Sequence, residues 1–210
     1  MNIIKCDIMN VLFHHHYTSQ RELADTTGYS LGKVNQTLAQ LQEEGYLTES
    51  YDLTKKAQIE REESKPQNAI ILAAGFGMRM VPINREIPKG LLEVHGEPLI
   101  ERQIRQLQEA GIEDITIVVG FMKESYEYLI DQYGVKVLVN REYAEKNNLH
   151  SMALAANRIG NTYIIPCDIW CEKNPFSENE LYSWYMVTDQ MVEESEVRVN
   201  RKLELVEVGA

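Results

Sequence analysis

The sequence predicts an α/β protein with a partial doubly wound parallel sheet, preceded by a small helical domain. Apolar runs typical of buried strands cover residues 69–74, 115–119, 135–139 and 163–167, and amphipathic helical segments separate them. Strands that alternate with helices favour a parallel sheet covered on both faces. The first 60 residues lack this alternation, and their apolar positions recur mainly at helical spacing, so we expect them to form a separate domain.

Composition and charge limit the functions that this chain can have. Of its 210 residues, 44% are hydrophobic and 25% charged, which is ordinary for a globular protein. The formal net charge of −11 argues against general binding to nucleic acid or to membrane surfaces, because both need a basic face. No apolar run approaches the roughly 20 residues of a membrane span. The charge and the short apolar runs together predict no membrane partner. The three cysteines do not make a disulfide framework, so we expect a cytoplasmic protein with reduced thiols.

The first domain, residues 1–60, is predicted to contain three helices and a small hairpin. Helical spacing of apolar residues predicts the first helix over about 3–15. Ser19 begins a capping box and a short second helix. Ser30 starts a longer helix, which Gly45 ends. After Gly45 the apolar pattern changes to period two, which predicts the hairpin.

Three helices followed by a hairpin is the order of a winged helix. The segment resembles the winged helix of the bacterial MarR-like regulators, in residues 19–23, Gly28, 30–41, 44–47 and 51–56. This resemblance implies a DNA-recognition helix at Ser30–Glu44, with contacts from Lys33, Asn35, Gln36 and Gln40. Charge argues against it, because five Lys and Arg stand against eight Asp and Glu in this domain, a net of −3. DNA is therefore a possible partner of this domain, but not the favoured one. We favour instead a role in dimerisation (for instance as a homodimer), in docking or in regulation.

The second domain, residues 69–210, follows a polar linker at 61–68 that contains Pro66. Its first predicted strand is followed by a loop with two glycines, Gly75 and Gly77, and then by two cationic residues, Arg79 and Lys89. Glycines let backbone N–H groups approach phosphate oxygens, and fixed cations offset the phosphate charge. In parallel sheets ligands bind outside the carboxyl ends of the strands. The later strands end, on the same edge, at Gly120, Asn140 and Asp168. We therefore expect a nucleotide site at this edge.

These residues resemble the nucleotidyltransferases that make NDP-sugars and CDP-alcohols. The resemblance lies in Leu-Ala-Ala-Gly-x-Gly-x-Arg over 72–79, then Pro82, Pro88-Lys89 and 91–101. Within that group, residues 110–120, 139–143 and 147–152 look most like the bacterial CTP:phosphocholine cytidylyltransferases. The resemblance implies a partial, Rossmann-like nucleotidyltransferase sheet.

The resemblance also implies a reaction and a set of site residues. The reaction is transfer of a cytidylyl group from CTP to phosphocholine or a similar phospho-alcohol, with release of pyrophosphate. Arg79 would hold the leaving phosphates, Lys89 the α-phosphate or the incoming phosphate, and Asp168 a Mg²⁺ ion. The implied nucleotide contacts are Leu72, Ala73, Ala74, Gly75, Phe76, Gly77, Gly120, Asn148 and Ser151.

Two other functions stay open at this point. One is a sugar-1-phosphate nucleotidyltransferase, and the other is a nucleotide-responsive winged-helix DNA-binding regulator. The family usually takes a second metal-binding aspartate and much of the acceptor pocket from a later part of the domain, whereas only 42 residues follow Asp168. We therefore expect a domain that is incomplete at its C-terminus, with the second metal ligand beyond residue 210 and with weak or no turnover at this length.

Overall fold

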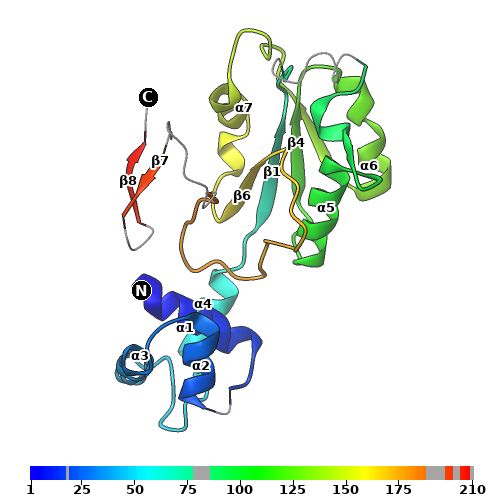
Figure 1. The fold of residues 1–210 in the computed structure, drawn as a ribbon. Coiled ribbons are helices and arrows are strands. Elements are labelled where there is room, and N and C mark those ends of the chain that lie inside the picture. The colour runs from blue at the N-terminus through cyan, green and yellow to red at the C-terminus, as the bar shows by residue number, and fades with distance from the viewer. Residues whose placement is uncertain (18, 78–85, 188–196, 201–203, 209–210) are drawn as a thin grey trace.

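The protein is described by a computed structural model, which covers residues 1–210 except 18, 78–85, 188–196, 201–203 and 209–210 (Figure 1). A helical N-terminal part packs below an α/β part in that view. The helices of the N-terminal part are α1 (Ile3–His14), α2 (Gln20–Thr27), α3 (Leu31–Glu43) and α4 (Lys55–Glu63). The three predicted helices are present in the predicted order.

Local capping explains where these helices begin. Ser19 accepts a hydrogen bond from the backbone N–H of Glu22 at the start of α2, as the capping box predicted. Ser30 caps α3 in the same way. Buried apolar side chains from the helices form one core, whose fully buried members include Ile8, Met9, Val34 and Leu41. This part of the fold is therefore fixed by short-range signals and one cluster of apolar residues.

The predicted hairpin is wrong over its second half. Only one isolated antiparallel bridge joins Leu47 to Leu53 among the described residues of this segment. Thr54 then caps α4 by accepting from Ala57 N–H, so Lys55 and Lys56 begin a helix. The capping threonine outweighs the period-two pattern, because a cap satisfies a helix N–H that would otherwise lack a partner.

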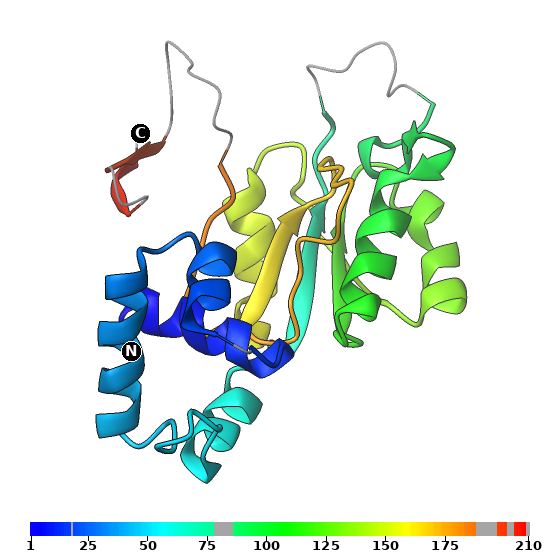
Figure 2. The same ribbon diagram turned by 60° about the horizontal axis from the view of Figure 1, so that its bottom comes forward.

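The α/β part contains a four-stranded parallel sheet. Its strands are β1 (Asn68–Ala73), β4 (Ile115–Val119), β5 (Lys136–Val139) and β6 (Thr162–Pro166), in the order β5-β4-β1-β6. Helices α5 (Leu99–Glu109) and α6 (Tyr128–Tyr133) cover one face, and α7 (Asn148–Leu154) covers the other (Figures 1 and 2). The doubly wound sheet predicted from the alternating pattern is therefore present.

Short elements connect and follow the sheet. Three are 3₁₀ turns, η3 (Lys89–Leu91), η4 (Lys123–Tyr126) and η5 (Ala156–Arg158). Strands β2 (Glu93–Val94) and β3 (Glu97–Pro98) form a small antiparallel pair before α5. Strands β7 (Val197–Val199) and β8 (Leu205–Val208) form an antiparallel hairpin apart from the main sheet. None of the described helices is long and apolar enough to cross a membrane.

Residues 177–182, the return segment, connect the α/β part to the N-terminal part. Asn179 is fully buried, and its amide donates to Arg61 O (2.6 Å) and to Ser64 Oγ (3.2 Å). The Tyr182 hydroxyl donates to the Asp7 carboxylate in α1 (2.8 Å). The chain that leaves β6 therefore comes back to contact both α4 and α1.

Candidate nucleotide site

The carboxyl ends of the parallel strands meet at one edge of the sheet. β1 pairs with β4 as far as Ala73, and beyond it Phe121 N–H donates to Ala74 O (3.1 Å). On the other side of β1, Cys167 N–H donates to Leu72 O (3.1 Å). The loops after β1, β4 and β6 therefore start side by side, at the edge where the sequence predicted a site.

The glycine loop after β1 lies against an aromatic ring of the next loop. Gly75 is exposed, and Gly77 has a φ of +68°, which glycine adopts at little cost. The Phe76 ring packs edge-on against Phe121, with 4.4 Å between the ring centroids. The residues before the loop carry apolar side chains, so the backbone supplies most of the polar groups here. These residues are Leu72, Ala73 and Ala74.

Gly120, at the end of β4, lies where no side chain fits. A Cβ at this position would lie 2.6 Å from Tyr143 Cβ and 2.8 Å from Ala74 O. Only glycine therefore allows the ends of β1 and β4 and the loop after β5 to approach this closely. A hollow of about 430 Å³ opens here, and its lining includes Gly120, Lys123, Asn140 and Tyr143. Sequence reasoning named Gly120 as a strand end, but the clash that explains the glycine involves residues far away in the chain.

Lys89 and Asp168 form an ion pair at the same edge. Their side chains are 23% and 35% exposed, so both charges reach solvent. Their neighbours explain the approach, because a Cβ on Gly90 would lie 3.1 Å from both Cys167 Cβ and the Tyr126 hydroxyl. Burial raises the pKa of Cys167 to about 12, so its thiol stays protonated and packs as an apolar group. Contact between glycine and cysteine thus brings the lysine and the aspartate together.

The loop after β5 is held by a buried hydrogen bond. The Asn140 amide donates to Ser151 Oγ (3.0 Å), and both side chains are buried. Asn140 Oδ1 also accepts from the backbone N–H of Glu142 (2.9 Å). Ser151 therefore holds the loop after β5 in place through Asn140. Asn148, by contrast, is exposed at the start of α7. A polar residue directly after an apolar strand was the signal for Asn140, although we did not include it among the predicted contacts.

The Asp168 carboxylate is an oxygen donor of the kind that Mg²⁺ prefers. It is partly exposed and paired with Lys89, and the backbone N–H of Cys167 beside it donates to Leu72 O, just before the glycine loop. Magnesium is usually bound through one or two carboxylates together with phosphate and water oxygens, so one carboxylate at a phosphate site is a suitable donor. Within the described part of the chain, no three His, Cys, Asp or Glu side chains gather into a group that could hold a metal. Arg79, the other predicted cation, lies outside the described residues.

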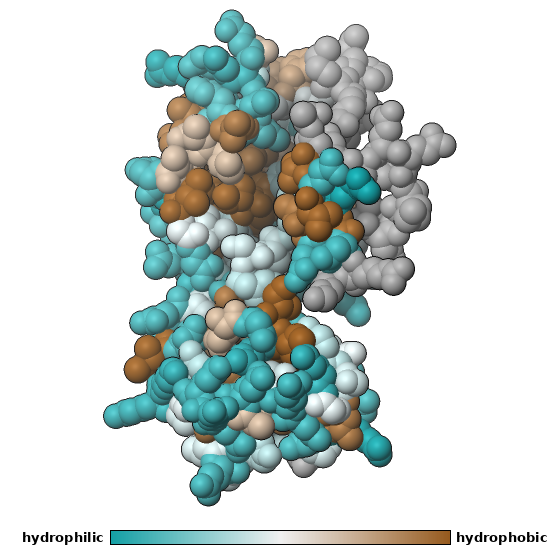
Figure 3. All heavy atoms as spheres, turned by 90° about the vertical axis from the view of Figure 1, so that its left-hand side faces the viewer, coloured by the Kyte–Doolittle hydropathy of each residue, from teal (hydrophilic) through white to brown (hydrophobic). Residues whose placement is uncertain are grey.

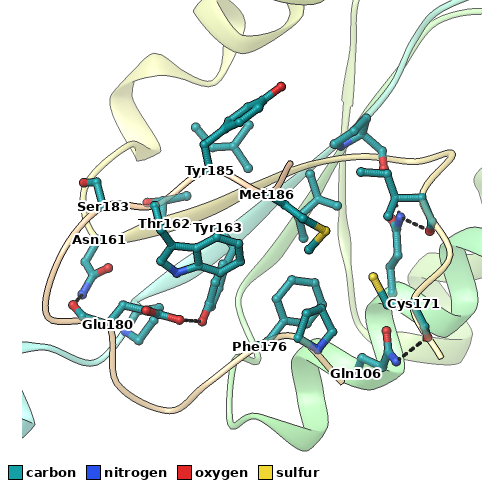
Figure 4. A pocket seen from close by; sticks show the side chains of 18 of the residues that line it. Gln106, Asn161, Thr162, Tyr163, Cys171, Phe176, Glu180, Ser183, Tyr185 and Met186 are labelled. Carbon is teal, nitrogen blue, oxygen red and sulfur yellow. Dashed lines mark hydrogen bonds between the residues drawn. The ribbon is translucent and has the colours of Figure 1, made fainter. Parts of the chain in front are cut away.

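A larger hollow of about 740 Å³ lies along the whole length of β6, from Thr162 to Pro166 and on to Ile169. Figure 3 shows apolar side chains on this face, and Figure 4 shows Tyr163, Phe176 and Met186 around the hollow. Among the described residues that line it, Glu180 carries the only charge. A polyphosphate needs cations, and a carboxylate would repel it, so this hollow is a poor nucleotide site despite its size.

The strand ends, the glycine loop and the Lys89–Asp168 pair define a class of protein, the α/β nucleotide-binding domains. Residues 69–175 match the family described as MobA-like NTP transferase domain, and the chain belongs to this family. Residues 1–48 match the family described as winged helix-turn-helix DNA-binding.

Several curated proteins are similar to the α/β part. A choline-phosphate cytidylyltransferase from Streptococcus pneumoniae is 44% identical over 117 residues, which cover 56% of this chain and 51% of that protein. A 2-aminoethylphosphonate cytidylyltransferase from Lancefieldella rimae is 43% identical over 114 residues, covering 53% and 46%. The chain thus spans about half the length of the curated relatives that it matches.

A solved structure is also similar to this part of the chain. It is that of the CTP:phosphocholine cytidylyltransferase from Streptococcus pneumoniae, with a TM-score of 0.53 and 44% identity. The match covers 54% of this chain and 50% of the solved chain. The similarity therefore extends from sequence to the arrangement of the sheet and its helices.

Proposed function

We propose that this chain transfers a cytidylyl group from CTP to a phospho-alcohol such as phosphocholine and releases pyrophosphate. The observation that carries the proposal is the Lys89–Asp168 pair beside the glycine loop, at the carboxyl ends of the strands. The names of the similar proteins, which act on choline phosphate and 2-aminoethylphosphonate, support the choice of nucleotide and acceptor. We further propose the cytoplasm as its location, which its three free cysteines support.

The reaction requires alignment and charge neutralisation. A phosphate oxygen of the acceptor attacks the α-phosphorus of CTP; a new P–O bond forms, and the bond to pyrophosphate breaks. We propose that backbone N–H groups around Gly75 and Gly77 hold the nucleotide phosphates. Lys89 would offset the charge that develops at the α-phosphate, and Arg79 the charge on the leaving pyrophosphate.

Asp168 would hold Mg²⁺, which when bound neutralises charge on phosphate oxygens. Without a nucleotide, the Asp168 carboxylate neutralises Lys89, so neither charge is left without a partner. A phosphate that takes over the lysine would free carboxylate oxygens for the metal. This exchange of partners accounts for a lysine and an aspartate paired at one phosphate site.

The test is pyrophosphate release by the full chain with CTP, Mg²⁺ and a panel of phospho-alcohols. Removing a charge-stabilising group typically costs about 10²–10³ in rate, and we expect a loss of that size in Lys89→Ala. The matched control is Lys136→Ala, which removes an exposed lysine at the opposite end of β5. If no acceptor with any nucleoside triphosphate gives release above the Lys89→Ala level, and CTP binds the wild type no more tightly than it binds Lys89→Ala, the proposed activity is wrong.

Two alternatives are tested by the same protein. A sugar-1-phosphate nucleotidyltransferase would release pyrophosphate only with sugar phosphates in the acceptor panel. A nucleotide-responsive regulator is favoured by the match of residues 1–48 and by the exposed Lys33, Asn35 and Gln36 on α3. Salt-dependent binding to a specific DNA sequence, altered by CTP, would support the regulator. Sedimentation of the chain would show whether it forms a homodimer.

A further inference from the structure

One buried side chain on α5 contacts both sides of Asp168. Gln103 is 3% exposed, and its amide nitrogen donates to Pro166 O (3.0 Å) and to Ile169 O (2.8 Å). These two carbonyl groups lie on either side of the dipeptide Cys167-Asp168. The turn that carries the carboxylate is therefore closed by one amide group from a different element.

The chemistry of this contact requires an amide. A primary amide nitrogen carries two hydrogens, and here each hydrogen has its own carbonyl acceptor. The two carbonyl oxygens also determine the orientation of the amide, because Gln103 Oε1 in this position would repel both of them. Oε1 itself has no hydrogen-bond partner among the described residues. Replacing the nitrogen would leave two carbonyl groups, of the partly buried Pro166 and Ile169, without this donor.

Neighbouring side chains of α5 contact the chain further along. The Gln106 amide, also 3% exposed, donates to Cys171 O (3.1 Å; Figure 4), and Arg102 donates to the same carbonyl group (2.7 Å). These contacts lie three residues past Asp168. Gln106 is therefore a matched control for Gln103, since it has the same side chain, helix and burial but a different acceptor.

We propose that Gln103 is a positioning residue for Asp168. The Gln103 amide closes the turn, so that the Asp168 carboxylate stays beside Lys89 and at the phosphate site. It acts through the backbone of residues 166–169. Its effect on catalysis rests on the proposed function, whereas its effect on the turn does not.

Hydrogen exchange of the full chain tests the effect on the turn. In Gln103→Leu we expect peptides that cover residues 166–170 to exchange about tenfold faster, because the turn has lost two hydrogen bonds. Gln106→Leu should speed exchange at 171–174 and leave 166–170 unchanged. Equal exchange at 166–170 in both variants, or unchanged exchange in Gln103→Leu, would overturn the inference. Gln103→Met, which has a similar length and no donor, replaces Gln103→Leu if that variant does not fold.

Kinetics test the effect on Asp168. We expect Gln103→Leu to lower kcat about tenfold and to raise the Mg²⁺ concentration for half-maximal rate, while KM for CTP changes less than about twofold. In an Asp168→Asn background the same substitution should have no further effect, because the carboxylate through which it acts is gone. Additive effects in this cycle would contradict the positioning role. If the wild-type chain shows no turnover, the exchange result alone decides the role of Gln103.

Discussion

The N-terminal part and the nucleotide edge of the sheet are held together in different ways. In the N-terminal part, each serine or threonine cap accepts a hydrogen bond from the backbone N–H three residues further along the chain. At the nucleotide edge, the decisive contacts join segments far apart in the chain, such as Gly90 with Cys167 and Gly120 with Tyr143. The first region can therefore be predicted from short motifs, whereas the site depends on how distant loops meet.

This difference separates stability from function. A core of apolar residues stabilises the N-terminal part, and Leu181 of the return segment packs against it. The nucleotide edge uses glycines and polar side chains, which contribute little apolar burial but fix where the loops lie. We expect substitutions in the two regions to move different quantities, and four predictions test this.

The largest expected effect on stability comes from the N-terminal core. Leu41 is fully buried, and Leu41→Ala should lower the free energy of unfolding by about 2–5 kcal/mol, through lost burial and a cavity. CTP affinity, measured by calorimetry at a temperature below the unfolding transition, should not change. Leu31→Ala on the same helix is the control, because Leu31 is 40% exposed. A CTP affinity that falls with Leu41→Ala would show that the two regions do not act independently.

The second prediction concerns the nucleotide edge, where we expect a substitution to change CTP affinity as well as stability. Gly120→Ala places a methyl group on Tyr143 and on Ala74 O, so the strand ends must move apart. We expect a loss of about 1–3 kcal/mol in stability, as for other overpacked sites, and a clear loss of CTP affinity.

The control for Gly120 is a glycine with free space around it. Gly32 in α3 has no positive φ, and a methyl group added there would meet no described atom within 4 Å. Gly32→Ala should therefore leave CTP affinity unchanged and raise helix stability by about 0.5–1 kcal/mol. Thermal unfolding and calorimetry on both variants check the pair, and equal CTP affinities for both would remove the steric argument.

The third prediction concerns the return segment, which links the two regions. Asn179→Ala removes the two hydrogen bonds that its fully buried amide donates to Arg61 O and to Ser64 Oγ, while Arg61 O keeps the Ser64 hydroxyl as a donor, and we expect a cost of about 1–3 kcal/mol. We expect faster hydrogen exchange in both α4 and the return segment, with little change at β1 and β4. Exchange that stays as slow as in the wild type would mean that this contact does not hold the two parts together.

Sequence patterns predicted the order of strands and helices because both depend on local periodicity. They also placed Gly75, Gly120 and Asp168 at one edge, since strand ends in a parallel sheet must meet there. They failed for the second half of the hairpin, where Thr54 starts a helix. They also missed Gly90 and Gln103, because nothing in the neighbouring residues shows that Cys167 or Pro166 lies against them.

The smallest expected effect is a dependence of stability on pH at the return segment. Burial raises the pKa of the Glu180 carboxyl above its usual value, and hydrogen bonds from Tyr163 and Trp184 oppose this only in part (Figure 4). A raised folded-state pKa means that the native chain binds the proton more tightly than the unfolded chain does. The stability from Glu180 is therefore fully present below the unfolded pKa and is lost as pH rises through the folded pKa.

The measurement is urea unfolding of wild type, Glu180→Gln and Glu178→Gln between pH 4 and pH 7. Glu180→Gln stays neutral at every pH, so its stability should decline less over this range than that of the wild type. Glu178→Gln is the control, because Glu178 is 56% exposed and should follow the wild type. If Glu180→Gln keeps the wild-type slope, burial of this carboxyl has no effect on stability, and the return segment is held by the Asn179 amide and its other hydrogen bonds.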